Sequence, residues 1–310
     1  MTEPSSPPSV PSDSDLVELV ERLARWIPAL LDEPDRAASI VAACRTALTE
    51  IELDGRSSFV EGVARIEAAA HDHSRHLLLF VDANGDLVPD EADHGWPPPD
   101  PRQVRRRGGG VGAVTRTADG VVTIAVDSLE AIDLAEPQID AAITLAQGAT
   151  GVILDLRRNG GGDPGTVARL AGFVLGQPPA PLSSVHQRDG EQVDWVSDPP
   201  PAAMCVPDGV PVAVLISAST FSSAEALAYH LQVRERVVVI GEPTPGAADH
   251  VTPFVLTRFV HAQLPVARVV DAATGASWEA TGVRPDVECA PERAHEVALE
   301  WLRARAPLGN

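Results

Sequence analysis

A strand-to-helix junction at residues 211–225 holds the serine best suited to nucleophilic chemistry. An apolar run, PVAVLIS, leads through Ser219 and Thr220 into a helix that we expect to begin near Ser222. Such a turn presents a side chain at the edge of a sheet, and the unpaired N–H groups and positive dipole end of the helix suit a developing oxyanion. Hydroxyl side chains at this place more often cap the helix. The segment alone therefore makes Ser222 a candidate nucleophile that needs further support.

The second candidate element is the end of the apolar strand GVILDL. From Asp155 the sequence continues as DLRRNGGG and reaches Asp163-Pro164, where the next helix is expected to start. Consecutive glycines allow close backbone approach and positive φ angles. Taken alone, the segment is either a plain turn or a nest that binds an anion. In combination with the serine segment it becomes a specific signal.

Together, these segments resemble the tail-specific, or C-terminal processing, serine peptidases. The hallmarks of that family are a D-L-R-x-N-x-G-G strand end, a later T-x-S-x-x-E helix start and then G-E-x-T-x-G. Here they stand in that order at residues 155–162, 220–225 and 241–246. The resemblance implies an α/β fold with a ClpP/crotonase-like core and an N-terminal helical domain. It also implies a serine-type peptidase that needs no metal or organic cofactor.

The resemblance assigns roles to the matching positions of this sequence. Ser222, three residues before Glu225, corresponds to the nucleophile. The backbone N–H groups of Ser223 and of either Gly161 or Gly162 correspond to the oxyanion hole. These are the strongest expectations for the site.

The general base and its partner follow from the branch of the family that the sequence matches. In the lysine-using branch the base comes directly after G-E-x-T-x-G, but Ala247 stands there. The other branch, that of the tricorn core protease and the interphotoreceptor retinoid-binding protein repeats, uses a histidine ahead of the core and a late glutamate. The segment WEATGVRPD matches its E-x-x-G-V-x-P-D pattern, so Glu279 is expected to orient the histidine and compensate its charge. Asn159 and His250 are the candidate substrate contacts.

Three histidines compete for the role of base in the segment AHDHSRHLLLF, namely His71, His73 and His76. The branch places its histidine directly before an apolar strand, often as D-x-H-L. His76 fits best, although Ser74 stands at the aspartate position, and His73 is the alternative. A histidine suits the chemistry because its pKa near 6.5 lets it accept and return a proton at neutral pH. Without the other motifs, a histidine between a helix and a strand would more often be a plain interface residue.

Periodicity and composition divide the chain into four parts. Residues 1–14 are rich in serine and proline and are predicted to be a disordered tail. Residues 15–75 show three helical patterns, with a capping box at Ser58-x-x-Glu61, and predict a three-helix domain. Residues 76–110 predict a strand pair around Asn84-Gly85 followed by a Pro/Arg/Gly-rich linker. Residues 111–310 alternate strands with helices and predict the catalytic α/β core. The stretch between the strand pair and residue 111 is too short for the PDZ module that many relatives carry.

Charge and residue usage exclude several functions. The chain has 310 residues and a net charge of −20, which argues against binding to nucleic acid or an anionic membrane. All 24 basic residues are arginine, so a P-loop, a pyridoxal Schiff base and a Ser–Lys dyad are excluded. The three cysteines form no metal spacing, and no apolar run is long enough to cross a bilayer. With no signal peptide in view, cytoplasmic is the default location.

The sequence thus predicts a serine peptidase acting on peptide or protein substrates, and a homo-oligomer is compatible with the fold. The main alternative is a non-catalytic module for apolar ligands, similar to the retinoid-binding protein repeats. Retention of candidates for serine, histidine and glutamate argues against it. Acyl-CoA chemistry on the related crotonase fold is a weaker rival, because it would explain neither the serine at the helix start nor the motif around Glu279.

Overall fold

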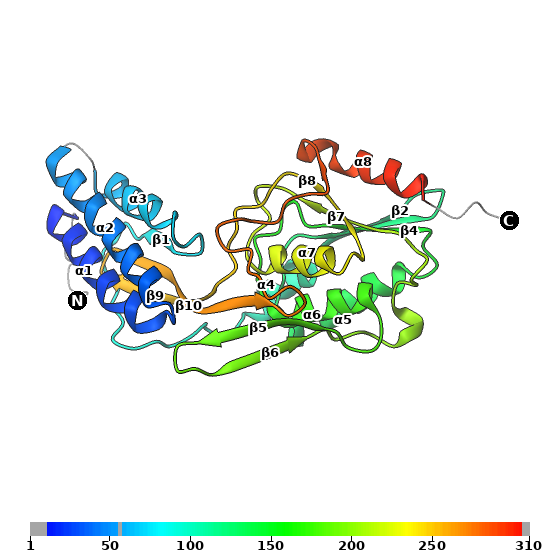
Figure 1. The fold of residues 1–310 in the computed structure, drawn as a ribbon, viewed down its shortest axis with the longest axis horizontal. Coiled ribbons are helices and arrows are strands. Elements are labelled where there is room, and N and C mark those ends of the chain that lie inside the picture. The colour runs from blue at the N-terminus through cyan, green and yellow to red at the C-terminus, as the bar shows by residue number, and fades with distance from the viewer. Residues whose placement is uncertain (1–10, 55–57, 306–310) are drawn as a thin grey trace, which may run out of the picture. The chain divides into compact units, whose positions relative to one another are not determined.

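The computed structural model describes residues 11–54 and 58–305. The chain forms two compact units (Figure 1). Unit 1 contains the residues up to Pro97 together with His186–Gln192 and Asp249–Arg268. Unit 2 contains Pro98–Val185, Val193–Ala248 and the residues from Val269 onward.

Three helices open unit 1, as the periodicity predicts. They are α1 (Asp13–Leu30), α2 (Pro34–Asp54) and α3 (Phe59–Ala70). The predicted capping box of α3 is present, because the Ser58 side chain accepts from Glu61 N–H while the Glu61 carboxylate accepts from Ser58 N–H. Because α1 begins at Asp13, residues 13 and 14 belong to a helix and not to the predicted tail. Residues 1–10 of that tail lie outside the described residues.

Three strands that contribute to unit 1 come from two distant parts of the chain. They are β1 (Leu78–Val81), β9 (His250–Thr257) and the first part of β10 (Val260–Asp271). Both β1 and β9 pair antiparallel with β10. The predicted hairpin around Asn84-Gly85 is therefore wrong. The Asp82 carboxylate accepts from both N–H groups of that dipeptide, so the signal marks a local turn, while the partner of β1 comes from far along the sequence.

The segment expected to be a plain linker is structured. A short helix, α4 (Pro101–Arg106), is capped by the Asp100 side chain, and Val104 on it is buried. A one-turn 3₁₀ helix, η1 (Gly108–Gly110), follows. Aspartate as cap and proline at the first helical position start this helix in spite of the surrounding arginines and glycines.

The predicted core at 111–310 is not one continuous block. Residues 186–192 and 249–268 belong to unit 1. For residues 249–268 the reason is that apolar side chains of β9 and β10 share a core with the helices. Phe254, Phe259 and Leu264 are among these buried side chains. The boundaries of the two units thus depend on the pairing of β10 with β1 and β9, which no local sequence pattern predicts.

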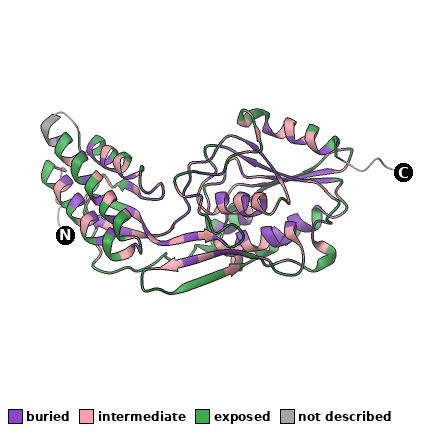
Figure 2. Ribbon diagram, in the orientation of Figure 1, coloured by how far each residue is buried: buried purple, intermediate pink, exposed green. Residues whose placement is uncertain are grey.

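A six-stranded sheet forms the centre of unit 2, in the order β11-β8-β7-β4-β3-β2. All neighbours are parallel except β2, which pairs antiparallel with β3. The strands are β2 (Val111–Arg116), β3 (Val121–Val126), β4 (Gly151–Asp155), β7 (Val212–Ile216), β8 (Val238–Gly241) and β11 (Val287–Glu288). The central strands are continuous buried runs, as Figure 2 shows in purple, which is typical of a parallel sheet covered on both faces.

Helices cover both faces of this sheet. Alternate side chains of the strands pack with α5 (Ile132–Leu145), α6 (Pro164–Leu175) and α7 (Ser223–Val233). The side chains between them pack with α8 (Pro291–Arg303) on the other face. A strand pair, β5 (Pro181–Gln187) and β6 (Gln192–Val196), and a 3₁₀ turn, η2 (Ala202–Met204), lie between α6 and β7 in the sequence. The predicted α/β class is confirmed.

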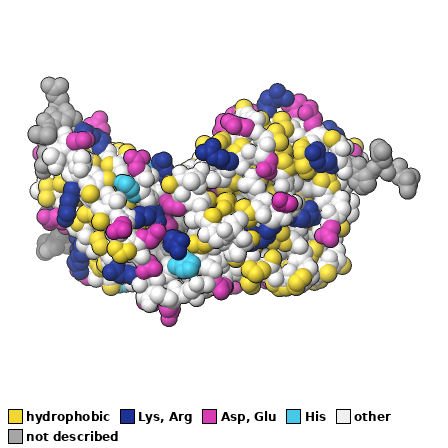
Figure 3. Space-filling model, in the orientation of Figure 1, with side chains coloured by type: hydrophobic (Ala, Val, Ile, Leu, Met, Phe, Trp, Pro, Cys, Tyr) yellow, Lys and Arg dark blue, Asp and Glu magenta, His cyan; other side chains and the backbone are white. Residues whose placement is uncertain are grey.

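The surface carries both signs of charge. On the face shown in Figure 3, arginine side chains are interspersed with acidic ones. Arg169 forms an ion pair with Asp140, and Arg303 forms one with Asp119. Within residues 11–54 and 58–305, no helix has the length and apolar character that a membrane span requires.

Candidate active site

Ser222 lies at a sharp turn between β7 and α7. It is the N-cap residue of α7 and has φ 55° and ψ −126°. A non-glycine residue in this region is strained, and such strain persists only where the surroundings fix the backbone. The N–H of Ser222 donates to Glu225 Oε2 at 2.8 Å. The predicted nucleophile therefore stands at a turn with an enforced conformation.

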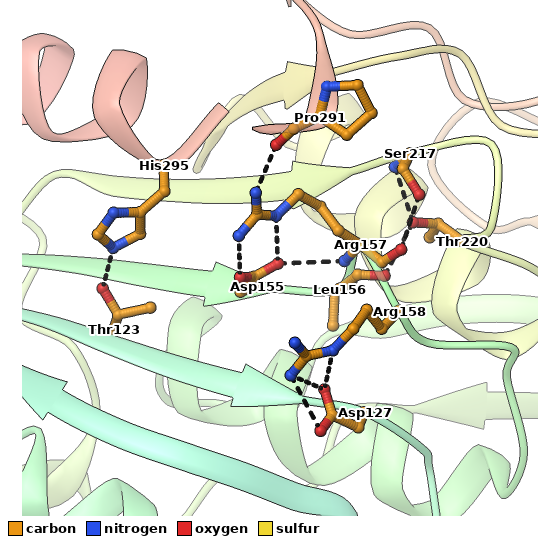
Figure 4. A network of polar contacts seen from close by, with 10 residues as sticks. All are labelled: Thr123, Asp127, Asp155, Leu156, Arg157, Arg158, Ser217, Thr220, Pro291 and His295. Atoms are coloured by element: carbon orange, nitrogen blue, oxygen red, sulfur yellow. Dashed lines mark hydrogen bonds and ion pairs between the residues drawn. The ribbon is translucent and has the colours of Figure 1, made fainter. Parts of the chain in front are cut away.

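Hydroxyl groups tie this turn to the loop that follows β4 (Figure 4). Thr220 Oγ1 donates to the Leu156 carbonyl at 2.8 Å and accepts from Ser217 N–H at 3.0 Å. Ser217 Oγ donates to the Arg157 carbonyl at 2.7 Å. Because β4 and β7 are parallel neighbours, their carboxyl ends meet at one edge of the sheet, and these bonds fix the two loops together.

An ion pair holds the start of the β4 loop (Figure 4). Arg157 donates to both carboxylate oxygens of Asp155, at 2.9 and 2.6 Å, and also to the Pro291 carbonyl. Burial raises the pKa of Asp155, but the bonds and charge of Arg157 outweigh it, and the pKa lies below its ordinary value. The arginine of the D-L-R motif thus anchors the loop to the start of α8.

The glycines of this loop pass directly against the Ser222 turn. Gly161 has φ +100°, and a Cβ atom on it would lie 2.8 Å from Ser222 Cβ and 2.9 Å from the Phe221 carbonyl oxygen. Ser223 Oγ donates to the Gly162 carbonyl at 2.8 Å. Only glycine allows this approach. The structure thus brings the candidate oxyanion residues together with the candidate nucleophile.

Asn159 has a different position from the one expected of a substrate contact. Its side chain is completely buried, with Nδ2 donating to the Val126 carbonyl and Oδ1 accepting from Gly161 N–H, both at 2.9 Å. Its carbonyl accepts from Phe221 N–H at 3.0 Å. This residue shapes the glycine loop from inside the protein. The Gly161 N–H group is directed to the Asn159 side chain.

Glu225 is a site residue whose function the sequence did not reveal. Its carboxylate is completely buried and accepts four hydrogen bonds. The donors are Ser222 N–H, Thr244 Oγ1, Gly246 N–H and Ala247 N–H, at 2.6 to 2.9 Å. Burial raises the pKa of Glu225, and these four bonds oppose the rise. The signal was present in the sequence, since Ser222-x-x-Glu225 has the spacing of a capping box.

Glu279 lies in a loop that is bonded to the G-E-x-T-x-G segment. Its Oε2 accepts from Ala248 N–H at 2.6 Å. Thr244 donates its N–H to the Val283 carbonyl, and Thr244 Oγ1 accepts from Val283 N–H at 2.7 Å. Glu225 is thus linked through Thr244 to the loop that carries Glu279, and all of these residues belong to unit 2.

His76 belongs to unit 1 and is only 3% exposed. Its Nδ1 lies 2.6 Å from the carbonyl oxygen of Asp249. A carbonyl oxygen only accepts, so Nδ1 carries the proton of the neutral ring and Nε2 is the acceptor. Burial lowers the pKa of His76 to about 4, the bond to Asp249 opposes this, and His250 lowers it further.

The other candidate histidines also lie in unit 1. The backbone carbonyl of His73 accepts from Arg36 Nε at 2.7 Å. His250 is the first residue of β9, and burial lowers its pKa. Asp249, which sequence reasoning missed, lies between Ala248 and His250 and gives no motif of its own.

The described residues offer little to a metal ion. In the part of the chain that the structure describes, no group of three or more histidine, cysteine, aspartate or glutamate side chains is placed to hold one. The acidic residues of the site are instead engaged by backbone N–H groups, by hydroxyl groups and by arginine, as described for Glu225, Glu279 and Asp155.

Comparisons with known proteins show which family the chain resembles. The sequence model of peptidase family S41 matches residues 121–289. A chloroplastic C-terminal processing peptidase from Tetradesmus obliquus is 31% identical over 153 residues, which are 47% of this chain and 30% of that protein. The chain therefore spans about 30% of the length of this curated relative.

Two solved structures resemble nearly the whole chain. A putative peptidase from Parabacteroides merdae has a TM-score of 0.61 at 16% identity, covering 94% of this chain and 97% of its own. A lipoprotein from Streptococcus agalactiae has a TM-score of 0.54 at 18% identity, covering 98% and 100%. At such low identity these two structures show the fold alone.

The chain belongs to peptidase family S41, since the family match spans more than half of its 310 residues. The predicted resemblance to the tail-specific peptidases is confirmed, and so is the ClpP/crotonase-like fold class.

Proposed function

We propose that this protein is a serine peptidase that hydrolyses peptide bonds with Ser222 as nucleophile, His76 as general base and Glu279 as the charge partner of the histidine. The observation that carries the proposal is the strained Ser222 turn with Gly161 packed against it. A serine that only capped a helix would not need a positive φ angle or a glycine at this distance.

In the proposed reaction, Ser222 Oγ attacks the scissile carbonyl carbon while His76 Nε2 accepts the hydroxyl proton. The N–H groups of Gly162 and Ser223 stabilise the resulting oxyanion. We favour Gly162 over Gly161 because Gly161 N–H already donates to Asn159. The intermediate expels the amine, which takes the proton from His76, and leaves an acyl-enzyme. Water, deprotonated by the same histidine, then releases the carboxylate product.

Support for His76 comes from its environment in unit 1. The Nδ1 bond to Asp249 fixes the tautomer in which Nε2 can accept a proton, and the lowered pKa keeps the ring neutral at pH 7. Glu279 bonds to Ala248, the residue directly before Asp249 in the chain. This connectivity supports the proposal that Glu279 and His76 serve one reaction. His73 remains the alternative base.

We extend the proposal to a peptide or protein substrate, with His250 as a side-chain contact. Asn159 acts as a positioning residue for the glycine loop. A homo-oligomer and a cytoplasmic location stay predictions, as does a catalytic domain that needs no PDZ module.

Labelling with a serine-reactive fluorophosphonate, scored by intact mass, tests the proposal. One adduct is expected on the wild type and none on Ser222→Ala, while His76→Ala and Glu279→Gln label much more slowly. Ser219→Ala is the matched control, because Ser219 is an exposed serine three residues away and should label like the wild type. An unlabelled wild type would refute the proposal and favour the non-catalytic module, which a retinoid or lipid titration would then test.

A further inference from the structure

Arg36, near the start of α2, binds two groups close to His76, namely the backbone of His73 and the side chain of Asp249. Its Nε donates to the His73 carbonyl at 2.7 Å, three residues before His76 in the chain. Its two terminal nitrogens donate to the two carboxylate oxygens of Asp249. The same guanidinium donates to Glu33 Oε2 at 2.8 Å. One side chain thus binds the segment that carries the histidine and the residue that accepts its Nδ1 proton.

Because the Asp249 carboxylate is buried, it needs the ion pair with Arg36. The Asp249 side chain has no exposed surface, and that of Arg36 is 17% exposed. A carboxylate without water must be compensated by charge and hydrogen bonds. The planar guanidinium meets both carboxylate oxygens at once, which a lysine could not do. Arg36 therefore holds the side chain of the same residue whose backbone carbonyl accepts from His76 Nδ1.

We propose that Arg36 and Asp249 form a positioning pair for His76, holding the Asp249 carbonyl and the His73–His76 segment so that the ring keeps its Nδ1–H tautomer and its place. The inference rests on the proposed function of His76 as base. It assigns the N-terminal helices a part in catalysis, because α2 supplies one member of the pair. Neither residue touches substrate or exchanges a proton with it.

The test combines the rate of fluorophosphonate labelling with nitrogen-15 NMR of the histidine rings, assigned with a His76→Gln variant. In Arg36→Gln we expect the labelling rate to fall on the order of 10²-fold, the loss typical of a misplaced catalytic group. The NMR spectrum should show loss of the single Nδ1–H tautomer of His76. The acid limb of the labelling rate should move up toward pH 6.5, the ordinary value for histidine, as water reaches the ring. Arg36→Lys, which keeps the charge but not the two-pronged contact, should lie between wild type and Arg36→Gln.

Two further variants keep the test decisive. The double variant Arg36→Gln/Asp249→Asn removes both charges together, so no buried charge is left without its partner. It replaces the single variant if Arg36→Gln does not fold. If the residues act as a pair, its labelling rate should fall no further than that of the worse single variant. Arg65→Gln is the matched control, because Arg65 is a 38% exposed arginine on α3 of the same unit. It should behave as the wild type does.

A folded Arg36 variant with wild-type labelling rate, pH profile and His76 spectrum would overturn the inference. A wild type that never labels would instead overturn the proposed function. In that case the His76 spectrum still decides whether Arg36 fixes the ring, since the NMR readout does not depend on catalysis.

Discussion

Glu225 offers the sharpest test of how the family motifs are held together. Its buried carboxylate accepts Ser222 N–H, Thr244 Oγ1, Gly246 N–H and Ala247 N–H. In Glu225→Gln the side chain keeps its shape but replaces one acceptor oxygen with a donor NH₂ group. Each carboxylate oxygen accepts at least one backbone N–H, so either amide orientation leaves a backbone donor facing another donor.

The magnitude follows from these contacts. A buried N–H without an acceptor costs about 1–3 kcal/mol. The remaining hydrogen bonds become weaker because their acceptor is no longer charged, while removal of the buried charge offsets part of that loss. We expect the free energy of unfolding to fall by about 2–4 kcal/mol in total. The amide orientation that faces Ser222 and Ala247 orphans two N–H groups, so the orientation that faces Thr244 should be preferred. Even then the Ser222 turn loses a charged acceptor, and labelling of Ser222 should slow.

Urea denaturation and fluorophosphonate labelling measure the two effects. The matched control is Glu61→Gln, because Glu61 makes the same Ser-x-x-Glu box at the start of α3 but is exposed to water. It should lose far less stability and label at the wild-type rate. Equal losses of stability in the two variants would refute the reasoning, since the buried network would then add nothing to an ordinary helix cap.

Two further predictions concern the glycine loop and the base. Gly161→Ala places a Cβ atom 2.8 Å from Ser222 Cβ at φ +100°, so it should destabilise the fold by about 1–3 kcal/mol through strain and slow the labelling. Gly160→Ala is the control, because a Cβ atom there meets no atom within 4 Å, and it should have neither effect. Similar urea midpoints and labelling rates for the two variants would contradict this prediction. Because burial lowers the pKa of His76 to about 4, the neutral base persists through mildly acidic pH. The labelling rate should therefore fall to half near pH 4 as the ring is protonated, and a half-maximum near the ordinary value of about 6.5 would argue against a buried base.

The Ser222 turn and its glycine loop could be predicted from sequence because their determinants are local. An apolar strand that leads into Thr220 and a helix start predicts where the serine lies. Three consecutive glycines indicate a backbone conformation that other residues rarely adopt. The structure adds the reason for the T-x-S-x-x-E spacing. The glutamate one turn into the helix reaches back to the Ser222 N–H and forward to Thr244.

The environment of the candidate base His76 could not be predicted, because its partners are distant in sequence. Asp249 follows a motif without belonging to it, and Arg36 is one of several polar residues on a helix. The pairing of β1 with β10 joins residues about 180 positions apart. The local turn signal at Asn84-Gly85 led instead to the prediction of a hairpin. Such contacts arise from the burial of apolar faces in the folded chain, and no spacing within a short window records them.

On the proposed mechanism, helices α1 to α3 are part of the scaffold that holds His76, because they share a core with β1, β9 and β10. Unit 1 is built from three separate stretches of chain, two of which lie inside the sequence of the core. Removing α1 to α3 would expose Phe254 and Phe259, which are buried against those helices, and would also take Arg36 from Asp249. The residues that hold His76 thus depend on the same packing that stabilises β9 and β10. If His76 is the base, as proposed, a base held in this way ties the reaction to the folding of helices α1 to α3.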